Sequence, residues 1–159
     1  SHEEAEKAAA AEREILELLK QEKDEAVLEK KLREKLGGQI PAAQVGAQIK
    51  AITSPWFRQF IEYDPATALR KVTCPVLAIN GGKDLQVPPQ EDLDAIAAAL
   101  QKGGNKDYKT VQLPKLNHLF QTCKTGAPSE YGTIDETIAP TALETIGDWI
   151  VSHTESPTR

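Results

Sequence analysis

The feature that most constrains the fold is a short, continuous apolar run, Val76–Asn80, which lies between a proline and a pair of glycines. A run of this length is typical of a strand that is buried on both faces of a parallel sheet. Residues 90–102 follow with helical periodicity, and residues 108–113 alternate as a second strand. Strand, helix and strand in this order predict one βαβ unit, and therefore an α/β fold.

The rest of the chain is predicted to be mainly helical. Residues 3–36 consist largely of Ala, Glu, Lys, Leu and Arg and contain no Gly or Pro, a composition that favours a helix. Their apolar residues form two patches that do not share one stripe, so we expect a break near residues 21–25. Shorter helices are predicted over residues 41–52, 54–61 and 140–151. The last of these is expected to turn four apolar residues inward: Leu143, Ile146, Trp149 and Ile150.

Charge and composition exclude several classes of partner. The net charge of the 159-residue chain is −5, which argues against nucleic acid, because phosphate binding needs a basic face. No stretch approaches the length of a membrane span, so we expect a soluble protein with no membrane partner, and its compartment is left open. Cys74 and Cys123 are not in a metal-ligand spacing, and no dinucleotide-binding fingerprint is present. We therefore expect neither a metal nor a cofactor.

The candidate catalytic residues follow the two predicted strands. Asp84 lies in the loop after the first strand, and His118 lies in the loop after the second. The carboxyl ends of parallel strands meet at one edge of a sheet, so the two side chains are expected to lie close together. A carboxylate there can accept a hydrogen bond from the histidine ring and fix it for general-base catalysis. Taken singly, an Asp in a glycine-rich turn is more often a turn former, and a loop His is more often a surface residue.

The same segments carry a family resemblance. Val76–Asn80, followed by Gly-Gly-Lys-Asp-Leu-Gln-Val-Pro-Pro, a helix, a strand and Leu-Asn-His-Leu-Phe, resembles the C-terminal part of the α/β-hydrolase superfamily. More narrowly, about residues 10–153 are similar to serine hydrolases of the carboxylesterase, dienelactone-hydrolase and prolyl-peptidase-like group. The resemblance implies that Asp84 is the acid and His118 the base of a catalytic triad.

The resemblance also implies how the chain is divided. Residues 3–63 would form a helical cap-like region, and residues 64–153 would form the C-terminal half of an α/β-hydrolase core, with tails at 1–2 and 154–159. In that fold, parallel strands carry helices on their faces. One βαβ unit supplies only two strands, and two strands do not form an independently stable sheet. We therefore expect the sheet to be incomplete.

The chain departs from the family pattern at the nucleophile. The serine should lie upstream in a Gly-x-Ser-x-Gly turn, and the sequence contains no such pentapeptide. We therefore expect a fragment or half of a serine hydrolase that supplies the acid and the base and is inactive alone. Its partner would be the missing N-terminal half or another copy of this chain. The complete enzyme would act on a small ester or peptide-like substrate.

Two further interpretations concern the N-terminal region. Trp56, Phe57 and Phe60 could line a substrate pocket, because capping segments often supply apolar walls, or they could be ordinary helix-packing residues. The charged helix over residues 3–36 leaves open an alternative function, in which the chain is a non-catalytic interaction module and that helix binds a partner. In that case neither Asp84 nor His118 would matter for function.

Overall fold

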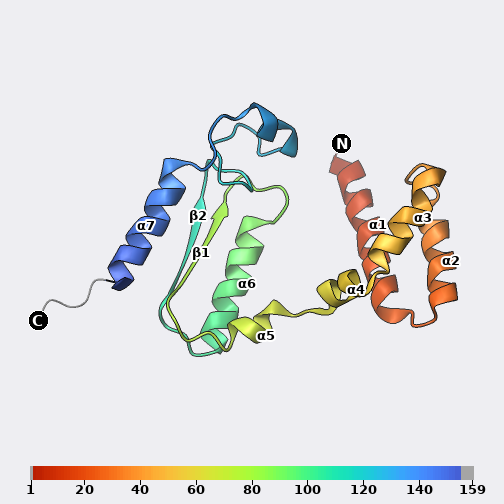
Figure 1. Cartoon of the computed structure of the whole chain (residues 1–159), viewed down its shortest axis with the longest axis horizontal. Helices are drawn as coiled ribbons and strands as arrows, with labels where there is room; N and C mark the ends of the chain where they lie inside the picture. The colour runs from red at the N-terminus through yellow and green to blue at the C-terminus, as the bar shows by residue number, and fades with distance from the viewer. Residues whose placement is uncertain (1, 155–159) are drawn as a thin grey trace, which may run out of the picture. The chain divides into compact units, whose positions relative to one another are not determined.

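The computed structural model describes residues 2–154, and their side chains from Ala10 onward. The chain divides between Tyr63 and Asp64 into two compact units (Figure 1). The N-terminal unit is helical, with α1 (His2–Gln21), α2 (Glu25–Leu36), α3 (Ala42–Ile52) and α4 (Pro55–Glu62). The C-terminal unit has α5 (Pro65–Leu69), β1 (Val76–Gly81), α6 (Pro89–Lys102), β2 (Tyr108–Leu113), the 3-10 helix η1 (Pro128–Thr133) and α7 (Pro140–Thr154).

The break expected in the first helical segment is confirmed. α1 ends at Gln21 and α2 begins at Glu25. Asp24 caps α2, because its Oδ1 accepts hydrogen bonds from the backbone N–H groups of Ala26 at 2.9 Å and Val27 at 3.0 Å. Such a cap satisfies two of the four N–H groups that have no partner within a helix. The break lets the two apolar patches, which lie on different sides of one long helix, face a common core.

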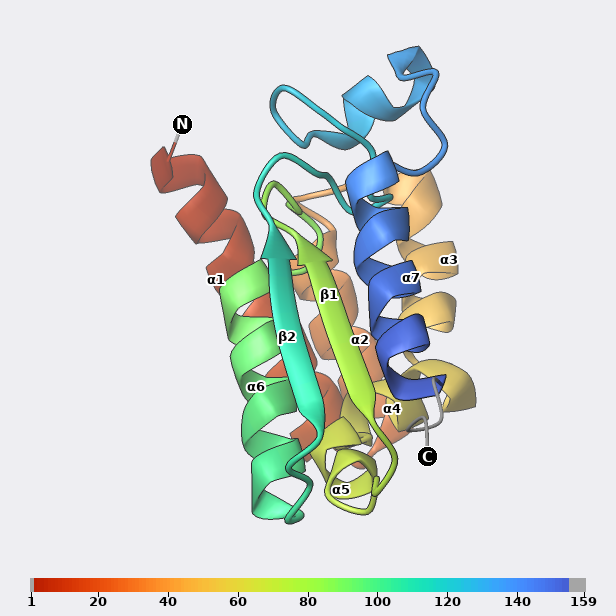
Figure 2. The same cartoon turned by 90° about the vertical axis from the view of Figure 1, so that its left-hand side faces the viewer.

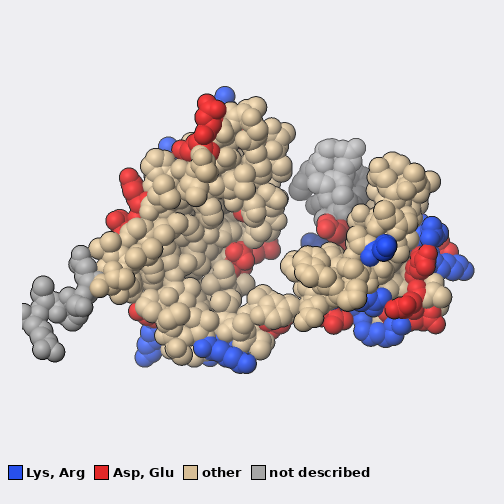
Figure 3. Space-filling view, viewed as in Figure 1, with Lys and Arg blue, Asp and Glu red and all other residues tan. Residues whose placement is uncertain are grey.

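The core of the N-terminal unit consists of aliphatic side chains from α1, α2 and α3. Phe57 and Ile61 of α4 pack against it and are partly buried. The buried members are Leu19, Leu28, Leu32, Leu36, Val45, Ile49 and Ile52. Charged side chains of both signs crowd the surface of this unit (Figure 3), with exposed pairs such as Arg33–Glu29 at 2.7 Å. Exposed pairs of this kind contribute little, so the aliphatic core holds the unit together.

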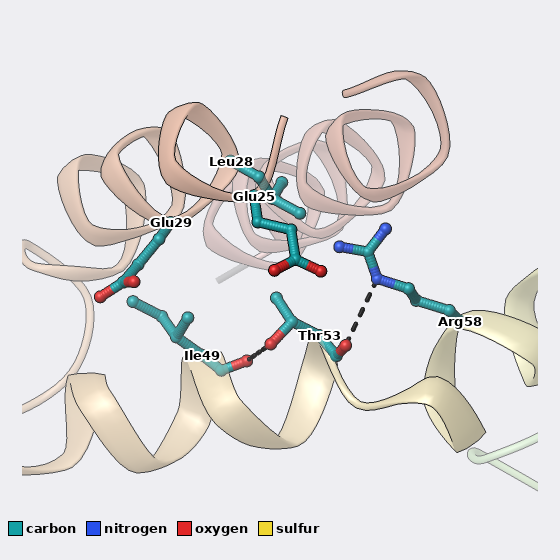
Figure 4. A pocket seen from close by; sticks show the side chains of 6 residues that line it. All are labelled: Glu25, Leu28, Glu29, Ile49, Thr53 and Arg58. Atoms are coloured by element: carbon teal, nitrogen blue, oxygen red, sulfur yellow. Dashed lines mark hydrogen bonds between the residues drawn. The ribbon is translucent and has the colours of Figure 1, made fainter. Parts of the chain in front are cut away.

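The joint between α3 and α4 is fixed by two hydrogen bonds (Figure 4). Thr53 donates from Oγ1 to the carbonyl of Ile49 at 2.8 Å, and Arg58 donates from Nε to the carbonyl of Thr53 at 3.3 Å. These residues border a pocket of about 150 Å³, whose other lining residues are Glu25, Leu28 and Glu29 of α2. The Thr53 hydroxyl shares the Ile49 carbonyl with the backbone N–H of Thr53, which donates to it at 2.9 Å, and Arg58 ties α4 to the end of α3.

The C-terminal unit is built around the predicted βαβ unit. β1 and β2 pair in parallel, with Val76 opposite Tyr108 and Gly81 opposite Leu113, and their arrows point the same way in Figure 2. Figure 1 shows the strands between α6 and α7. The mixed helix and strand content is compatible with part of an α/β-hydrolase fold.

β1 is less buried than its pattern is typical of. Such a run is typical of a strand buried on both faces, but Val76–Asn80 are all half-buried, and only Gly81 is fully buried. The physical reason is the strand count: within residues 2–154, each strand has one neighbour. A second neighbouring strand and its flanking helices are what would remove the remaining side-chain surface from water.

The expectation for α7 is wrong. Leu143, Ile146 and Ile150 are 54%, 36% and 53% exposed, and Trp149 is half-buried. The helix is anchored near its start, where the buried residue Ala142 packs with Leu116. Its apolar face therefore lacks a cover among the described residues, although its sequence has the pattern of a helix that packs on a core.

We predict that Leu32→Ala will destabilise the N-terminal unit by about 2–5 kcal/mol, because Leu32 is fully buried and its removal leaves a cavity. The matched control is Val27→Ala on the same helix, where the side chain is 40% exposed, and we expect a change within about 0.5 kcal/mol. Urea denaturation followed by circular dichroism measures both. Equal losses for the two variants would contradict the assigned core.

Candidate active site

The two loops after the strands are joined by backbone hydrogen bonds. The N–H of Gly82 donates to the carbonyl of Leu113 at 2.7 Å, and the N–H of Lys83 donates to the carbonyl of Leu116 at 2.9 Å. These bonds continue the pairing of β1 and β2 beyond the ends of the strands. The loop that carries Asp84 and the loop that carries His118 are therefore held side by side.

Gly81 permits this close approach. A Cβ at this position would overlap the backbone carbonyl oxygens of Leu116 and Asn117. Both oxygens belong to the loop of His118, and backbone atoms cannot move aside as a flexible side chain can. A residue without a side chain is therefore required where the two loops meet.

Asp84 is held by its own loop. It is 8% exposed, and its Oδ1 accepts hydrogen bonds from the N–H groups of Gln86 at 2.8 Å and Val87 at 3.0 Å. Burial raises the pKa of the Asp84 carboxyl group, but hydrogen bonds from Val87, His118 and Gln86 lower it by more, so the pKa lies below the ordinary value of 3.8. Asp84 is therefore a carboxylate at neutral pH and only accepts hydrogen bonds.

The structure brings Asp84 and His118 together, with Nδ1 of His118 lying 2.8 Å from Oδ2 of Asp84. Because the carboxylate cannot donate, Nδ1 carries the proton and donates it. The neutral ring then has its lone pair on Nε2, which has no hydrogen-bond partner among residues 10–154. The His118 side chain is 38% exposed. This arrangement can take up a proton at Nε2 and stabilise the resulting cation through Asp84.

A cavity of about 250 Å³ lies beside the pair. Besides Asp84 and His118, it is lined by Ile79, Asn80, Val87, Asp92 and Phe120. The lining is thus partly apolar, with a few polar groups next to the imidazole. A space of this composition suits a small organic group better than a free ion.

A second His–Asp pair in the same unit differs from Asp84–His118 because both of its histidine nitrogens have partners. Nε2 of His153 lies 3.1 Å from Oδ1 of Asp107, and Nδ1 of His153 lies 2.7 Å from the carbonyl of Trp149. The Trp149 carbonyl raises the pKa of His153, burial opposes this, and Asp107 raises it further, so the pKa lies above 6.5. Both ring nitrogens are occupied, so His153 has no free atom for proton transfer.

Sequence reasoning missed a segment that holds the acid loop. Lys83 donates from Nζ to the carbonyls of Cys123 at 3.3 Å and Lys124 at 2.6 Å, and Gln86 donates from Nε2 to the Tyr131 hydroxyl at 2.9 Å. These contacts flank Asp84 on both sides. They join residues 40 or more positions apart, and nothing in the local sequence signals them.

The three aromatic candidates lie on α4 in the N-terminal unit. Trp56 and Phe60 are 71% and 64% exposed, and their rings stack with centroids 5.5 Å apart. Phe57 is partly buried against the aliphatic core. Of the two interpretations, helix packing therefore describes Phe57. A role of the three residues in a substrate pocket stays a prediction.

Two classes of site are not found within the described part of the chain. No group of three or more His, Cys, Asp or Glu side chains is placed to hold a metal ion. None of the helices that the structure describes has the length and apolar character needed to cross a membrane.

We predict that Gly81→Ala will destabilise the C-terminal unit by about 1–3 kcal/mol, because the added methyl group forces the two loops apart. The same variant should disrupt the Asp84–His118 hydrogen bond, which NMR of the His118 ring detects. Gly147→Ala in α7 is the control, because a Cβ there meets open space, and it should be neutral or stabilising by up to about 1 kcal/mol. An intact hydrogen bond in Gly81→Ala would contradict this account.

We also predict a pH effect that depends on Asp84. Because its folded pKa is below its unfolded value, its contribution to stability is present above about pH 4 and is lost as the pH falls through the folded pKa. The free energy of unfolding should therefore fall more steeply below about pH 4 in the wild type than in Asp84→Asn. Urea denaturation at a series of pH values measures the difference, and parallel curves would contradict the prediction.

Comparison with known proteins identifies the family of the chain. The model of the prolyl oligopeptidase family matches residues 44–136, which is more than half of the 159 residues and includes both Asp84 and His118. No curated protein and no solved structure gives a significant match to the chain. The extent of the family match shows that the chain belongs to the prolyl oligopeptidase family, within the α/β-hydrolase superfamily.

Proposed function

We propose that this chain supplies the acid, Asp84, and the base, His118, of a serine-hydrolase triad that cleaves ester or amide bonds. The observation that carries the proposal is the 2.8 Å contact between Nδ1 of His118 and Oδ2 of Asp84, with Nε2 left without a partner among the described residues. His153 also contacts an aspartate, but it has no free nitrogen. The free Nε2 therefore distinguishes a catalytic base from a structural histidine.

The proposed acyl-transfer chemistry follows from the tautomer of His118, which carries its proton on Nδ1. Nε2 of His118 takes the proton from a serine hydroxyl as its oxygen attacks the carbonyl carbon of the substrate. The ring becomes a cation, which Asp84 stabilises while itself remaining ionised. Nε2 then gives the proton to the departing alcohol or amine, and water repeats the sequence to release the acid. In each half of the reaction, His118 thus takes up one proton and gives it back.

The serine itself would come from residues outside this sequence. No Gly-x-Ser-x-Gly segment is present. Ser54 caps α4 by accepting from the N–H of Phe57 at 3.2 Å, and Ser129 lies within η1. Neither serine lies on the strand-turn-helix that exposes a nucleophile in this superfamily. We propose that the chain is inactive alone for this reason.

The polypeptide that completes the site is proposed to be the N-terminal half of an α/β-hydrolase core. Two incompletely covered surfaces of the C-terminal unit support this proposal. β1 has only β2 as a neighbour within the described residues, and its apolar side chains are half-buried. The exposed apolar face of α7 lies in the same unit, and Figure 3 shows few charges over much of the surface of that unit. Additional parallel strands with their helices would cover both surfaces.

The alternative function, an interaction module built on the charged N-terminal helix, has less support. The apolar side chains that a partner of α1 would need are used within its own unit. Leu19 is 1% exposed, and Ile15 and Leu18 pack against the same core. Over residues 10–21, the side chains that α1 exposes to solvent are mainly charged, which is typical of a solvated helix face.

The test uses an activated ester, 4-nitrophenyl acetate. The chain alone should give no turnover above buffer, and the chain extended by the sequence encoded upstream should give a burst followed by steady hydrolysis. In the extended protein, His118→Ala should lower kcat by roughly 10⁴–10⁶-fold and Asp84→Asn by roughly 10⁴-fold. His153→Ala is the matched control, because it also removes a histidine that pairs with an aspartate, and it should leave kcat unchanged.

Several outcomes would overturn the proposal. Turnover by the chain alone that survives His118→Ala would show that the hydrolysis does not use this pair. An extended protein that contains no serine labelled by a fluorophosphonate would remove the nucleophile from the scheme. Activity restored by dimerisation of this chain, without any added sequence, would assign the completing partner to a second copy instead.

A further inference from the structure

The residue before His118, Asn117, is fully buried, and both polar atoms of its side chain have hydrogen-bond partners. Oδ1 of Asn117 accepts from the N–H groups of Leu119 and Gln121, both at 2.9 Å, and Nδ2 donates to Oε1 of Gln121 at 3.0 Å. Asn117 has an exposed fraction of 0%. A buried amide with all of these partners is strongly fixed, because any rotation would leave a polar group unsatisfied.

The backbone closes the same loop. The N–H of Asn117 donates to the carbonyl of Gln121 at 3.0 Å, and the N–H of Phe120 donates to the carbonyl of Asn117 at 3.0 Å. Phe120 has a φ of 58°, in the left-handed region that residues other than glycine rarely adopt. This conformation persists only because the surrounding hydrogen bonds impose it. Residues 117–121 are therefore a tight turn held from the inside by one side chain.

The turn is also anchored from outside. Gln121 is 8% exposed, and its Nε2 donates to the carbonyl of Glu136 at 2.9 Å. The N–H of Ala139 donates to the carbonyl of Phe120 at 2.8 Å. These bonds fasten the turn to the segment that leads into α7. The asparagine amide is needed because a single group must both accept from two N–H groups and donate to Gln121, which a carboxylate cannot do.

The ring of His118 depends on this support. Its only polar contact among residues 10–154 is the one to Asp84, and its side chain is 38% exposed. One hydrogen bond does not by itself fix the ring, so its direction is set by the backbone that carries it. We infer that Asn117 is a positioning residue, which holds the 117–121 turn in the conformation that points Nδ1 of His118 at Asp84. Its consequence for catalysis rests on the proposed function, but its effect on the ring does not.

The test is NMR of the His118 ring in the chain itself, labelled with ¹⁵N. The Nδ1-bound proton is assigned by its loss in Asp84→Asn and by its persistence in His153→Ala. In Asn117→Ala we expect this proton to exchange with solvent about tenfold faster or more, the change that corresponds to losing about one hydrogen bond. We also expect the tautomer to shift toward the mixture of a free imidazole.

Asn105→Ala is the matched control for a merely structural effect. Asn105 is also 8% exposed in the same unit, and its Nδ2 donates to the carbonyls of Val72 at 3.1 Å and Cys74 at 3.0 Å. Its loss should lower the melting temperature as Asn117→Ala does, yet leave the exchange rate and the tautomer of His118 at their wild-type values. If Asn117→Ala does not fold, Gln121→Ala removes the partner of Nδ2 and should shift the ring signals in the same direction.

Two results would overturn the inference. One is a folded Asn117→Ala variant, or a folded Gln121→Ala variant, with wild-type ring signals. The other is an equal change of the ring signals in Asn105→Ala. In the extended, active protein, Asn117→Ala should lower kcat about 100-fold with little change in KM. Absence of any activity in that protein would count against the proposed function, while the NMR result would still decide the role of Asn117.

Discussion

Parallel pairing of β1 with β2 is the constraint on which the candidate site depends. The register places Gly81 opposite Leu113, so both chains leave the sheet at the same edge. The two loops continue the pairing through backbone hydrogen bonds, and Gly81 lets them approach. A shift of one residue in this register would move every side chain of one strand to the other face. The distance between Asp84 and His118 is thus a consequence of sheet geometry as much as of the two side chains.

Much of this arrangement could be predicted from local sequence. The apolar run Val76–Asn80, the helical period after it and the alternation at 108–113 are signals that neighbouring residues carry by themselves. The cap at Asp24 likewise acts within its own turn. Because parallel strands end at one edge, the proximity of Asp84 and His118 followed from topology alone, before any side-chain position was known.

Other features could not be predicted, because they depend on partners distant in sequence. The pattern of β1 is typical of a strand with a neighbour on each side, whereas within the described residues the strand has one neighbour and is half-buried. The apolar face of α7 was expected inward for the same reason. The contacts of Lys83 with the carbonyls of Cys123 and Lys124 span about 40 residues, and Asn117 resembles any polar loop residue until its burial is known.

The two strands also differ in the charge and polarity of their side chains. β2 has an exposed lysine, Lys109, and further exposed polar side chains at Thr110 and Gln112, whereas β1 has no charged residue. Lysines on a boundary strand discourage pairing with further polypeptide, because their charge would have to be desolvated. Of the two sides of this sheet, the side of β1 is therefore the one whose strand presents no charge against pairing with further polypeptide.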